Sequence, residues 1–328
     1  MELESISQLL VYTAIAVYAL AFLLFALDIV SHGSNVKAEA EAVRAKRKSL
    51  VGAGGAHIDA DAGEPAAVSV PAEAARDTLV KPRKPRRNWL RAGFAITVMA
   101  WLLHLGGAVL RGIAAERVPW ANMYEFALTG VVLVVAVFIF AQFWNDLRFL
   151  GVYITAMATL FLGAATVNYY VPISPLPPAL QSAWLVVHVF VATLAIGFLA
   201  ISSGLSIVQL IRHRFKNNGF VSTLPGADTL ETVAYRLAVV GFLFWSFTLI
   251  AGAIWAHQSW GRYWGWDTKE VWTFIIWVVY AGYLHARSTR GWRGTASAVL
   301  NLIGFGTILF NYAVVNVYFE GLHAYSGL

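Results

Sequence analysis

The chain has 328 residues, of which 59% are hydrophobic and 13% are charged, and its mean hydropathy is +0.63. A soluble domain needs less apolar side chain than this and cannot cover so much of it with so few charges, so the composition excludes an ordinary soluble protein and favours the lipid bilayer as solvent. The net charge of +6 does not indicate a nucleic-acid-binding protein, because the Lys and Arg residues lie between apolar runs of membrane-spanning length.

Eight apolar runs predict transmembrane helices, because a helix needs about 20 residues to cross about 30 Å of hydrocarbon. The first run follows an acidic start, MELESISQ, and is long enough to span, so we expect a retained helix and not a cleavable signal peptide. The predicted fold is all-α, a polytopic bundle of about eight transmembrane helices. The runs lie near 8–30, 91–111, 124–143, 149–170, 183–211, 232–256, 271–287 and 294–317.

A segment of different composition separates the first two runs. Residues 31–90 are rich in Ala, Pro, Gly and charged residues, contain the basic clusters EAVRAKRK and KPRKPRR, and show no apolar periodicity. This composition predicts a basic, disordered loop. The chain then divides into a first transmembrane helix within 1–30, the loop at 31–90 and a seven-helix domain at 91–328.

The distribution of Lys and Arg predicts the orientation of the bundle, because positively charged loops stay in the cytoplasm. Loop 31–90 and the turns at 212–216 and 286–293 are basic and are therefore expected to be cytoplasmic. Eight spans then place both termini on the outer side of the membrane, together with the segment between the sixth and seventh runs and the tail at 319–328.

The outer segment WGRYWGWDTKE, residues 260–270, concentrates aromatic side chains beside charged ones. An interfacial aromatic belt explains one or two tryptophans, but it explains a larger group less well. Trp260 and Trp264 are expected to share one face of a helical turn, where their rings can stack on a flat apolar macrocycle. The group within 260–277 consists of Trp260, Trp264, Trp266, Trp272 and Trp277.

The charged residues of this region each have more than one interpretation. Asp267 and Glu270 precede an apolar run with capping-box spacing, which predicts Asp267 as the N-cap and Glu270 as the N3 residue of the seventh span. Arg262 can face an anionic ligand group such as a propionate, as can Arg111 and Arg117. An arginine that snorkels to the membrane surface is at least as good an interpretation for each of the three.

Three of the eight histidines are candidates for a ligand site. His188 lies about one and a half turns into the fifth run, His323 follows the eighth run on the same outer side, and His285 lies near the inner end of the seventh. Neutral imidazole is the usual axial ligand of haem iron, and ionisable groups within a bilayer often mark a ligand site. An interhelical hydrogen bond is the alternative for each one alone. The others are expected to be solvated (His32, His57, His213), bonded to a neighbouring helix (His104) or at a helix end (His257).

These residues together resemble a known family. The motif WGRYWGWDTKEVW, followed by YLHAR and a terminal GLHAYSG, resembles the tryptophan-rich signature of haem-handling membrane proteins, of the CcsA/ResC type of cytochrome c biogenesis protein. The likeness extends from about residue 90 to the C-terminus, and RVPWANMYEF also resembles a stretch of the family. Two departures are Thr268, where members commonly have a proline suited to the first helical position, and the length of loop 31–90.

The resemblance implies a ligand set and partners. Members hold haem on the outer face of the membrane, under the tryptophan-rich segment and between two external histidines, which correspond to His188 and His323. A further histidine within a span corresponds to His285, with a counterpart supplied by a ResB/CcsB-type partner in the plasma membrane. The implied cargo is haem b, bound transiently, the implied acceptor is apocytochrome c, and thioredoxin-like proteins are further partners. The other candidate haem-binding residues are Trp260, Trp264, Trp266, Asp267 and Arg262.

The implied reaction is haem attachment by a cytochrome c haem lyase complex of which this chain is a subunit. The chain has no cysteine and therefore no thiol of its own, which fits a protein that presents haem to the thiols of an apocytochrome. Two other functions remain open: a proton-coupled transporter without haem and a b-type respiratory cytochrome subunit. The latter requires histidines paired at two depths within the bilayer, and neither alternative explains the tryptophan segment.

Overall fold

The computed structural model describes residues 2–54, 87–215, 219–289 and 291–323, and these residues form helices without a β-strand among them. The predicted all-α fold is confirmed. Eight long helices cover the eight predicted runs: α1 (Glu2–Gly54), α2 (Asn88–Ala115), α3 (Met123–Ala141), α4 (Gly151–Asn168), α5 (Ala183–Arg214), α7 (Ala227–Trp260), α8 (Thr268–Ser288) and α9 (Thr295–Phe310). Helix α9 continues through a π-helical turn, η3 (Asn311–Val315), into α10 (Asn316–Tyr318). The shorter elements are η1 (Arg148–Leu150), η2 (Pro178–Leu180) and α6 (Gly219–Ser222).

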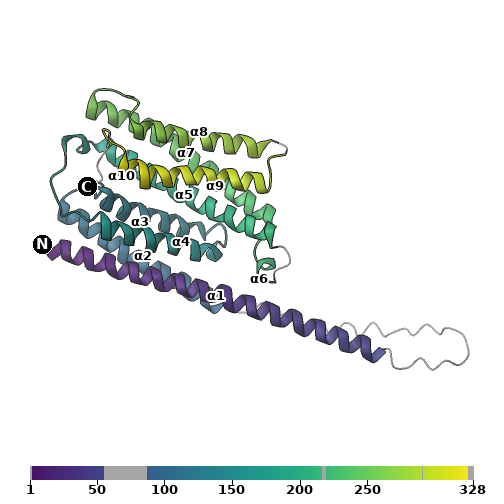
Figure 1. Cartoon of the computed structure of the whole chain (residues 1–328). Helices are drawn as coiled ribbons and strands as arrows, with labels where there is room; N and C mark the ends of the chain where they lie inside the picture. Colours follow the sequence, from purple (N-terminus) through teal and green to yellow (C-terminus); the bar gives the residue numbers. More distant parts are fainter. Residues whose placement is uncertain (1, 55–86, 216–218, 290, 324–328) are drawn as a thin grey trace, which may run out of the picture.

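Within the described part of the chain, seven helices are long and apolar enough to cross a membrane. Helix α8 is outside this set, because its tryptophans, tyrosines and terminal charges lower its hydropathy. It nevertheless packs against α7 and α9 in the same bundle (Figure 1). The number of long helices among the described residues is thus eight, and seven of them have the length and hydropathy of a membrane span.

Helix α5 lies at the centre of the bundle, where it packs against α3, α7 and α9. Helices α1 and α2 run antiparallel, since Ser7 bonds to Gly107 at one end of the pair and Asp28 bonds to Leu90 at the other. Helix α1 begins and α10 ends at the same end of the bundle, called here the termini end (Figure 1). An even number of long helices that alternate in direction brings both ends of the chain to the same end of the bundle.

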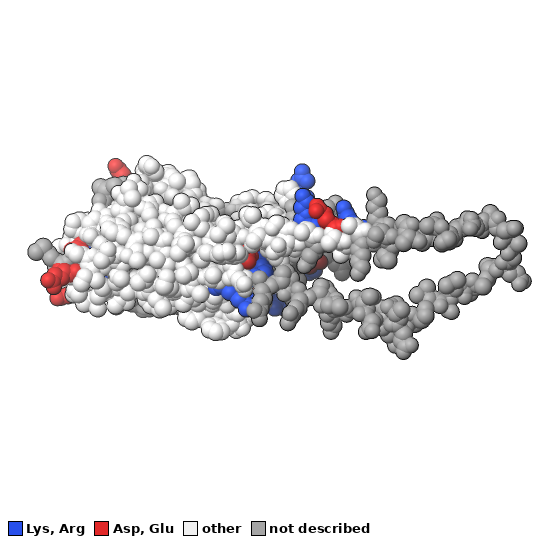
Figure 2. Space-filling view, turned by 90° about the horizontal axis from the view of Figure 1, so that it is seen from below, with Lys and Arg blue, Asp and Glu red and all other residues white. Residues whose placement is uncertain are grey.

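The flanks of the bundle are apolar and exposed. Figure 2 shows a flank that is almost free of charge, with the visible Lys and Arg side chains gathered where α1 leaves the bundle, opposite the termini end. Large apolar side chains that would be costly in water stand on such surfaces, as expected for helices in contact with lipid. Examples are Leu23, Leu102, Leu160, Leu243 and Ile303.

The predicted boundary between a first helix and a disordered loop at residue 31 is wrong, because α1 continues to Gly54. Residues 35–50 are mostly Ala, Glu, Lys and Arg, which are strong helix formers, so a helix already nucleated by its apolar half continues through them. At 53 residues, α1 is about 80 Å long and extends well past the bundle (Figure 1). His32, expected to be solvated, is buried against Phe220. The rest of the predicted loop, 55–86 with His57, lies outside the described residues.

Candidate functional site

The tryptophan segment is a loop between two capped helix ends. Helix α7 ends at Trp260, where Gly261 adopts a left-handed conformation with φ of 72° as the C-cap. Helix α8 begins after Asp267, which is its N-cap, and Glu270 completes the predicted capping box. The loop itself is not helical. The prediction that Trp260 and Trp264 share one face of a helical turn is therefore wrong, because Gly261 stops the helix between them.

Glu270 holds this loop in place. Its Oε2 accepts hydrogen bonds from the backbone N–H groups of Gly265 (2.8 Å) and Asp267 (3.1 Å), and its Oε1 accepts one from the guanidinium of Arg262 (3.1 Å). A Cβ on Gly265 would lie 1.7 Å from that guanidinium, so a side chain here would push Arg262 away from its present position. Arg262, a sequence candidate for binding a propionate, thus already has a carboxylate partner.

His188 projects from α5 with one ring nitrogen bound and the other free. Its Nδ1 lies 3.0 Å from the carbonyl oxygen of Thr248 on α7. Because a carbonyl only accepts, Nδ1 carries the proton and Nε2 keeps its lone pair. The ring packs on Gly252, where a Cβ would come within 2.7 Å of the imidazole. The absence of a side chain at Gly252 therefore makes room for the ring in this orientation.

His323, which follows α10, has the same arrangement. Its Nδ1 lies 2.7 Å from Oδ2 of Asp267, whose Oδ1 accepts the N–H of Leu322 at 3.0 Å. The hydrogen bond from His323 and those from the backbone lower the pKa of Asp267 below its usual range, against the raising effect of burial. The carboxylate is ionised and only accepts, so Nδ1 of His323 donates, and among the described residues no hydrogen bond occupies Nε2. A carboxylate partner of this kind orients a ligand imidazole.

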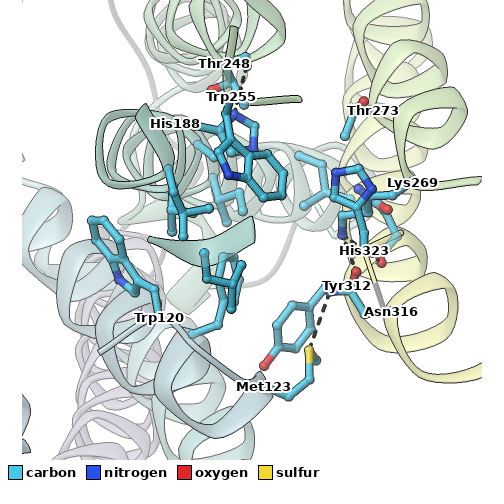
Figure 3. A pocket seen from close by; sticks show the side chains of 18 of the residues that line it. Trp120, Met123, His188, Thr248, Trp255, Lys269, Thr273, Tyr312, Asn316 and His323 are labelled. Atoms are coloured by element: carbon cyan, nitrogen blue, oxygen red, sulfur yellow. Dashed lines mark hydrogen bonds between the residues drawn. The ribbon is translucent and has the colours of Figure 1, made fainter. Parts of the chain in front are cut away.

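The structure brings His188 and His323 to one cavity of 140 Å³ at the termini end, called here the outer cavity. Figure 3 shows His188 and Trp255 on one side of it and His323 and Lys269 on the other. The indole of Trp255 stacks on His188 (centroids 5.8 Å apart, planes at 17°) and meets His323 edge-on (5.3 Å, 68°). Trp255 is buried, and its Nε1 donates to the carbonyl oxygen of Ala179. One aromatic side chain thus contacts both candidate ligands.

Sequence reasoning missed Trp255 and Lys269. A signal for Trp255 was present, because Thr248, Gly252 and Trp255 follow the i, i+4, i+7 spacing of one helix face. That face of α7 supplies the acceptor for His188, the space beside it and the ring stacked on it. Lys269 lies between Asp267 and Glu270 of the capping box. Helix capping explains that motif by itself, so the sequence offered no separate reason to select Lys269.

The predicted tryptophans lie at different distances from the histidines. The ring of Trp260 meets His323 edge-on at 4.9 Å. Trp264 contacts Trp266 and Phe274, and with both histidines it lines a second cavity of 60 Å³ under the loop. Trp266 is 75% exposed and has a left-handed backbone with φ of 59°. Trp260 and Trp264 therefore surround the site, whereas Trp266 faces outward.

The other histidines lie apart from this pair. His285 follows Glu270 by fifteen residues in the single helix α8, which places it about 22 Å along the axis, and its side chain is exposed. His104 is fully buried beside Tyr18 of α1, as expected for contact with a neighbouring helix. His257 is exposed and stacks on Tyr263.

Arg111 and Arg117 are bound to a buried carboxylate and are neither snorkelling nor open to a ligand. Glu125, which is fully buried, pairs with Arg111 at 3.0 Å and with Arg117 at 2.6 Å. Arg111 is only 1% exposed, and it also pairs with Glu4 of α1 and donates to the carbonyl of Val171. This network fastens α1, α2 and α3 together at the termini end.

Two imidazoles with free Nε2 atoms suit a metal that already carries most of its ligands. Among the described residues, no three His, Cys, Asp or Glu side chains converge to hold a bare ion. An iron porphyrin brings four nitrogens of its own and needs two axial donors. The two cavities, of 140 and 60 Å³, are smaller than the roughly 300–1,000 Å³ typical of ligand pockets. A macrocycle held by both histidines would therefore extend beyond these cavities.

Comparison with known proteins points to one family. The sequence profile described as "Cytochrome C assembly protein" matches residues 120–323, a range that contains both histidines, Trp255 and the tryptophan loop. The "Cytochrome c biogenesis protein CcsA" of Guillardia theta is 32% identical over 269 residues, which cover 75% of this chain and 89% of that protein. The protein of the same name in Trieres chinensis is 32% identical over 252 residues, or 66% of this chain and 81% of that one.

A solved structure shares the fold. The "Cytochrome c Heme Lyase CcmF" superimposes with a TM-score of 0.60 at 16% sequence identity. The match covers 95% of this chain and 47% of that chain, so this chain spans about half the length of that protein. At this identity the comparison supports the arrangement of helices and nothing finer.

Proposed function

Because this chain belongs to the Cytochrome C assembly protein family, we propose that it presents haem to apocytochrome c at the outer face of the membrane. The chain is an integral membrane protein with a role in cytochrome c biogenesis. One observation carries the finer proposal: His188 and His323 each have Nδ1–H bound to a fixed acceptor and Nε2 free, and both line one cavity.

Haem is the cargo in this proposal, and the two imidazoles are its axial ligands. Six-coordinate iron has no open position for oxygen, so the ligand pair would protect the haem from reaction with oxygen until an apocytochrome binds. The acceptors behind the rings, Thr248 and Asp267, bind Nδ1 of each imidazole and so leave Nε2 as the nitrogen that would bind iron. The rings of Trp255 and Trp260, which already contact these histidines, provide apolar surface for the macrocycle.

The reaction that follows needs little from this chain beyond positioning. In each thioether bond, the sulfur of an apocytochrome cysteine bonds to a vinyl carbon of haem, and the thiol proton goes to the other vinyl carbon. The chain has no cysteine and cannot become linked to haem in this way. A histidine of the apocytochrome then replaces one axial ligand, and the product leaves. In this sense the chain is a subunit of a haem lyase.

His285 is proposed as an inner haem ligand that acts with a partner protein. Its side chain is exposed on α8, about 22 Å from the start of that helix, so a second histidine from a ResB/CcsB-type subunit has access to it. The location is the plasma membrane, with the Lys- and Arg-rich end of the bundle in the cytoplasm and the termini end outside. The supporting observation is the gathering of positive charge at one end (Figure 2).

The other two functions lack comparable support. A b-type cytochrome needs histidines paired at two depths of the bilayer, but among the described residues His104 faces Tyr18 and His285 stands alone on the surface of α8. A haem-free transporter gives no reason for two imidazoles with matched Nδ1 acceptors beside a buried indole.

The test is the visible spectrum of the protein purified in mild detergent, with and without a co-expressed ResB-type partner. We expect a Soret band and the sharp reduced α and β bands of six-coordinate haem, lost in His188→Ala and in His323→Ala. Haem that survives both substitutions would move the site inward to His285. A colourless protein in both preparations, from cells with ample haem, would overturn the proposal.

A further inference from the structure

The outer cavity is lined by one lysine in addition to the two histidines. Of the described residues that line it, Lys269 is the only Lys or Arg, and no Asp or Glu lines it. Lys269 also lines the smaller cavity under the tryptophan loop, as do His188 and His323. Figure 3 shows it beside His323, opposite His188. The amino group of Lys269 therefore lies at the same two cavities as both imidazoles.

The partners of this ammonium group are neutral. Its Nζ donates to Oδ1 of Asn316 and lies 3.5 Å from the carbonyl oxygen of Asn311, in the π-helical turn η3. An ammonium has three N–H donors, so one donor and the whole charge are left over. Among the described residues, Lys269 belongs to no ion pair. A charge in a mostly apolar cavity without a direct counter-ion is unfavourable, so such a lysine either loses its proton or gains an anion as partner.

The neighbouring carboxylates are already bound elsewhere. Asp267 accepts from His323 and from the N–H of Leu322, and Glu270 accepts from Arg262 and two loop N–H groups. Neither carboxylate forms a direct ion pair with Lys269 among the described residues. A carboxylate on the ligand is therefore a direct partner that Lys269 can gain without breaking these bonds.

We propose that Lys269 binds a carboxylate of the cargo, one propionate of haem, and so sets the rotation of the macrocycle between His188 and His323. This inference rests on the proposed function and adds a second recognition element to it. Three arginines were sequence candidates for binding a propionate, and each has a carboxylate partner in the structure. Arg262 pairs with Glu270, and Arg111 and Arg117 pair with Glu125. Lys269 is the cation of this region that remains available.

The test compares two ligands that differ only in these carboxylates. Haem and haem dimethyl ester, whose propionates are neutral esters, are titrated into the detergent-purified protein by the Soret shift. We expect the wild-type protein to prefer haem by about tenfold or more, the effect of a charge-assisted hydrogen bond. Lys269→Met should bind haem as weakly as it binds the ester, so the preference disappears, whereas Lys269→Arg should retain it. Arg262→Met is the matched control and should keep the wild-type preference.

If Lys269→Met still prefers haem over the dimethyl ester as the wild type does, the inference is overturned. It is also overturned if Arg262→Met loses this preference while Lys269→Met keeps it. If Lys269 only supports the fold, Lys269→Met weakens both ligands by the same factor and their ratio stays constant, which also contradicts it. Lys269→Gln, which can still bond Asn316, provides the same comparison if the Met variant does not fold. Failure of the proposed function is distinct, because the wild-type protein would then bind neither ligand through His188 and His323.

Discussion

Asp267 and His323 lie 56 residues apart in the sequence and are joined by a hydrogen bond of 2.7 Å from Nδ1 of the imidazole to the carboxylate. The same carboxylate caps α8 through the N–H of Lys269. Gly321 permits the approach, since a Cβ there would lie 2.3 Å from Oδ1 of Asp267. One aspartate therefore fixes both the start of the helix after the tryptophan loop and the tautomer of a candidate ligand.

Replacing Asp267 by Asn should weaken haem binding at the outer cavity. The amide keeps some capping ability but no longer holds the Nδ1–H of His323 with a charge, so we expect affinity to fall by about 10–100-fold, as for other partners of ligand histidines. A Soret titration of the purified variant measures this. Asp146→Asn is the control, because Asp146 is exposed and pairs only with Arg148. Equal haem affinity in both variants would show that the carboxylate does not orient His323.

The same aspartate should give a pH-dependent term in stability. Its folded-state pKa lies below the usual value of 3.8, so its contribution is complete above that value and is lost as pH falls through the lower, folded-state pKa. We expect the difference in apparent Tm between wild type and Asp267→Asn to shrink as pH falls below about pH 4. A difference that already disappears between pH 7 and pH 6 would assign the effect to another titrating group.

Gly252→Ala should displace the imidazole of His188. The added Cβ would lie 2.7 Å from Cε1 and 2.9 Å from Nδ1 of the ring, so the ring must leave the carbonyl of Thr248. We expect outer-site haem affinity to fall by about tenfold or more, measured by Soret titration. Gly306→Ala on α9 is the matched control, because no atom lies within 4 Å of its new Cβ. That variant should bind haem normally and be as stable as the wild type or slightly more so.

Glu125→Gln should destabilise the termini end. It leaves the guanidinium of Arg111, which is 1% exposed, with only the partly exposed Glu4 as counter-ion. Removing one partner from a buried ion pair costs about 3–5 kcal/mol. We expect a lower apparent Tm in detergent and easier proteolysis between α2 and α3. Asp146→Asn, at an exposed pair, should change little. If the two substitutions have equal effects, the network around Glu125 is not important for stability.

The helices and most of the candidate residues could be predicted because they depend on local properties. A run of apolar residues forms a spanning helix wherever the chain places it, and the capping box at Asp267 and Glu270 acts within one helical turn. Two wrong predictions, a helix end at residue 31 and a helical turn at 260–264, concern where helices end. Residues 31–54 have few apolar positions but high helix propensity, and Gly261 ends α7 although the residues around it suit a helix.

The sequence by itself determined an all-α membrane bundle, the presence of histidines near its ends and a tryptophan-rich turn with a capped helix after it. Only the tertiary structure decided which imidazole nitrogens are free, because the acceptors Thr248 and Asp267 are 60 and 56 residues from the histidines that they bind. It also decided that Arg111, Arg117 and Arg262 have carboxylate partners, whereas Lys269 bonds to Asn311 and Asn316. Hydropathy and propensity are sums over neighbours in the chain, whereas a hydrogen-bond partner or a counter-ion is chosen by packing between helices.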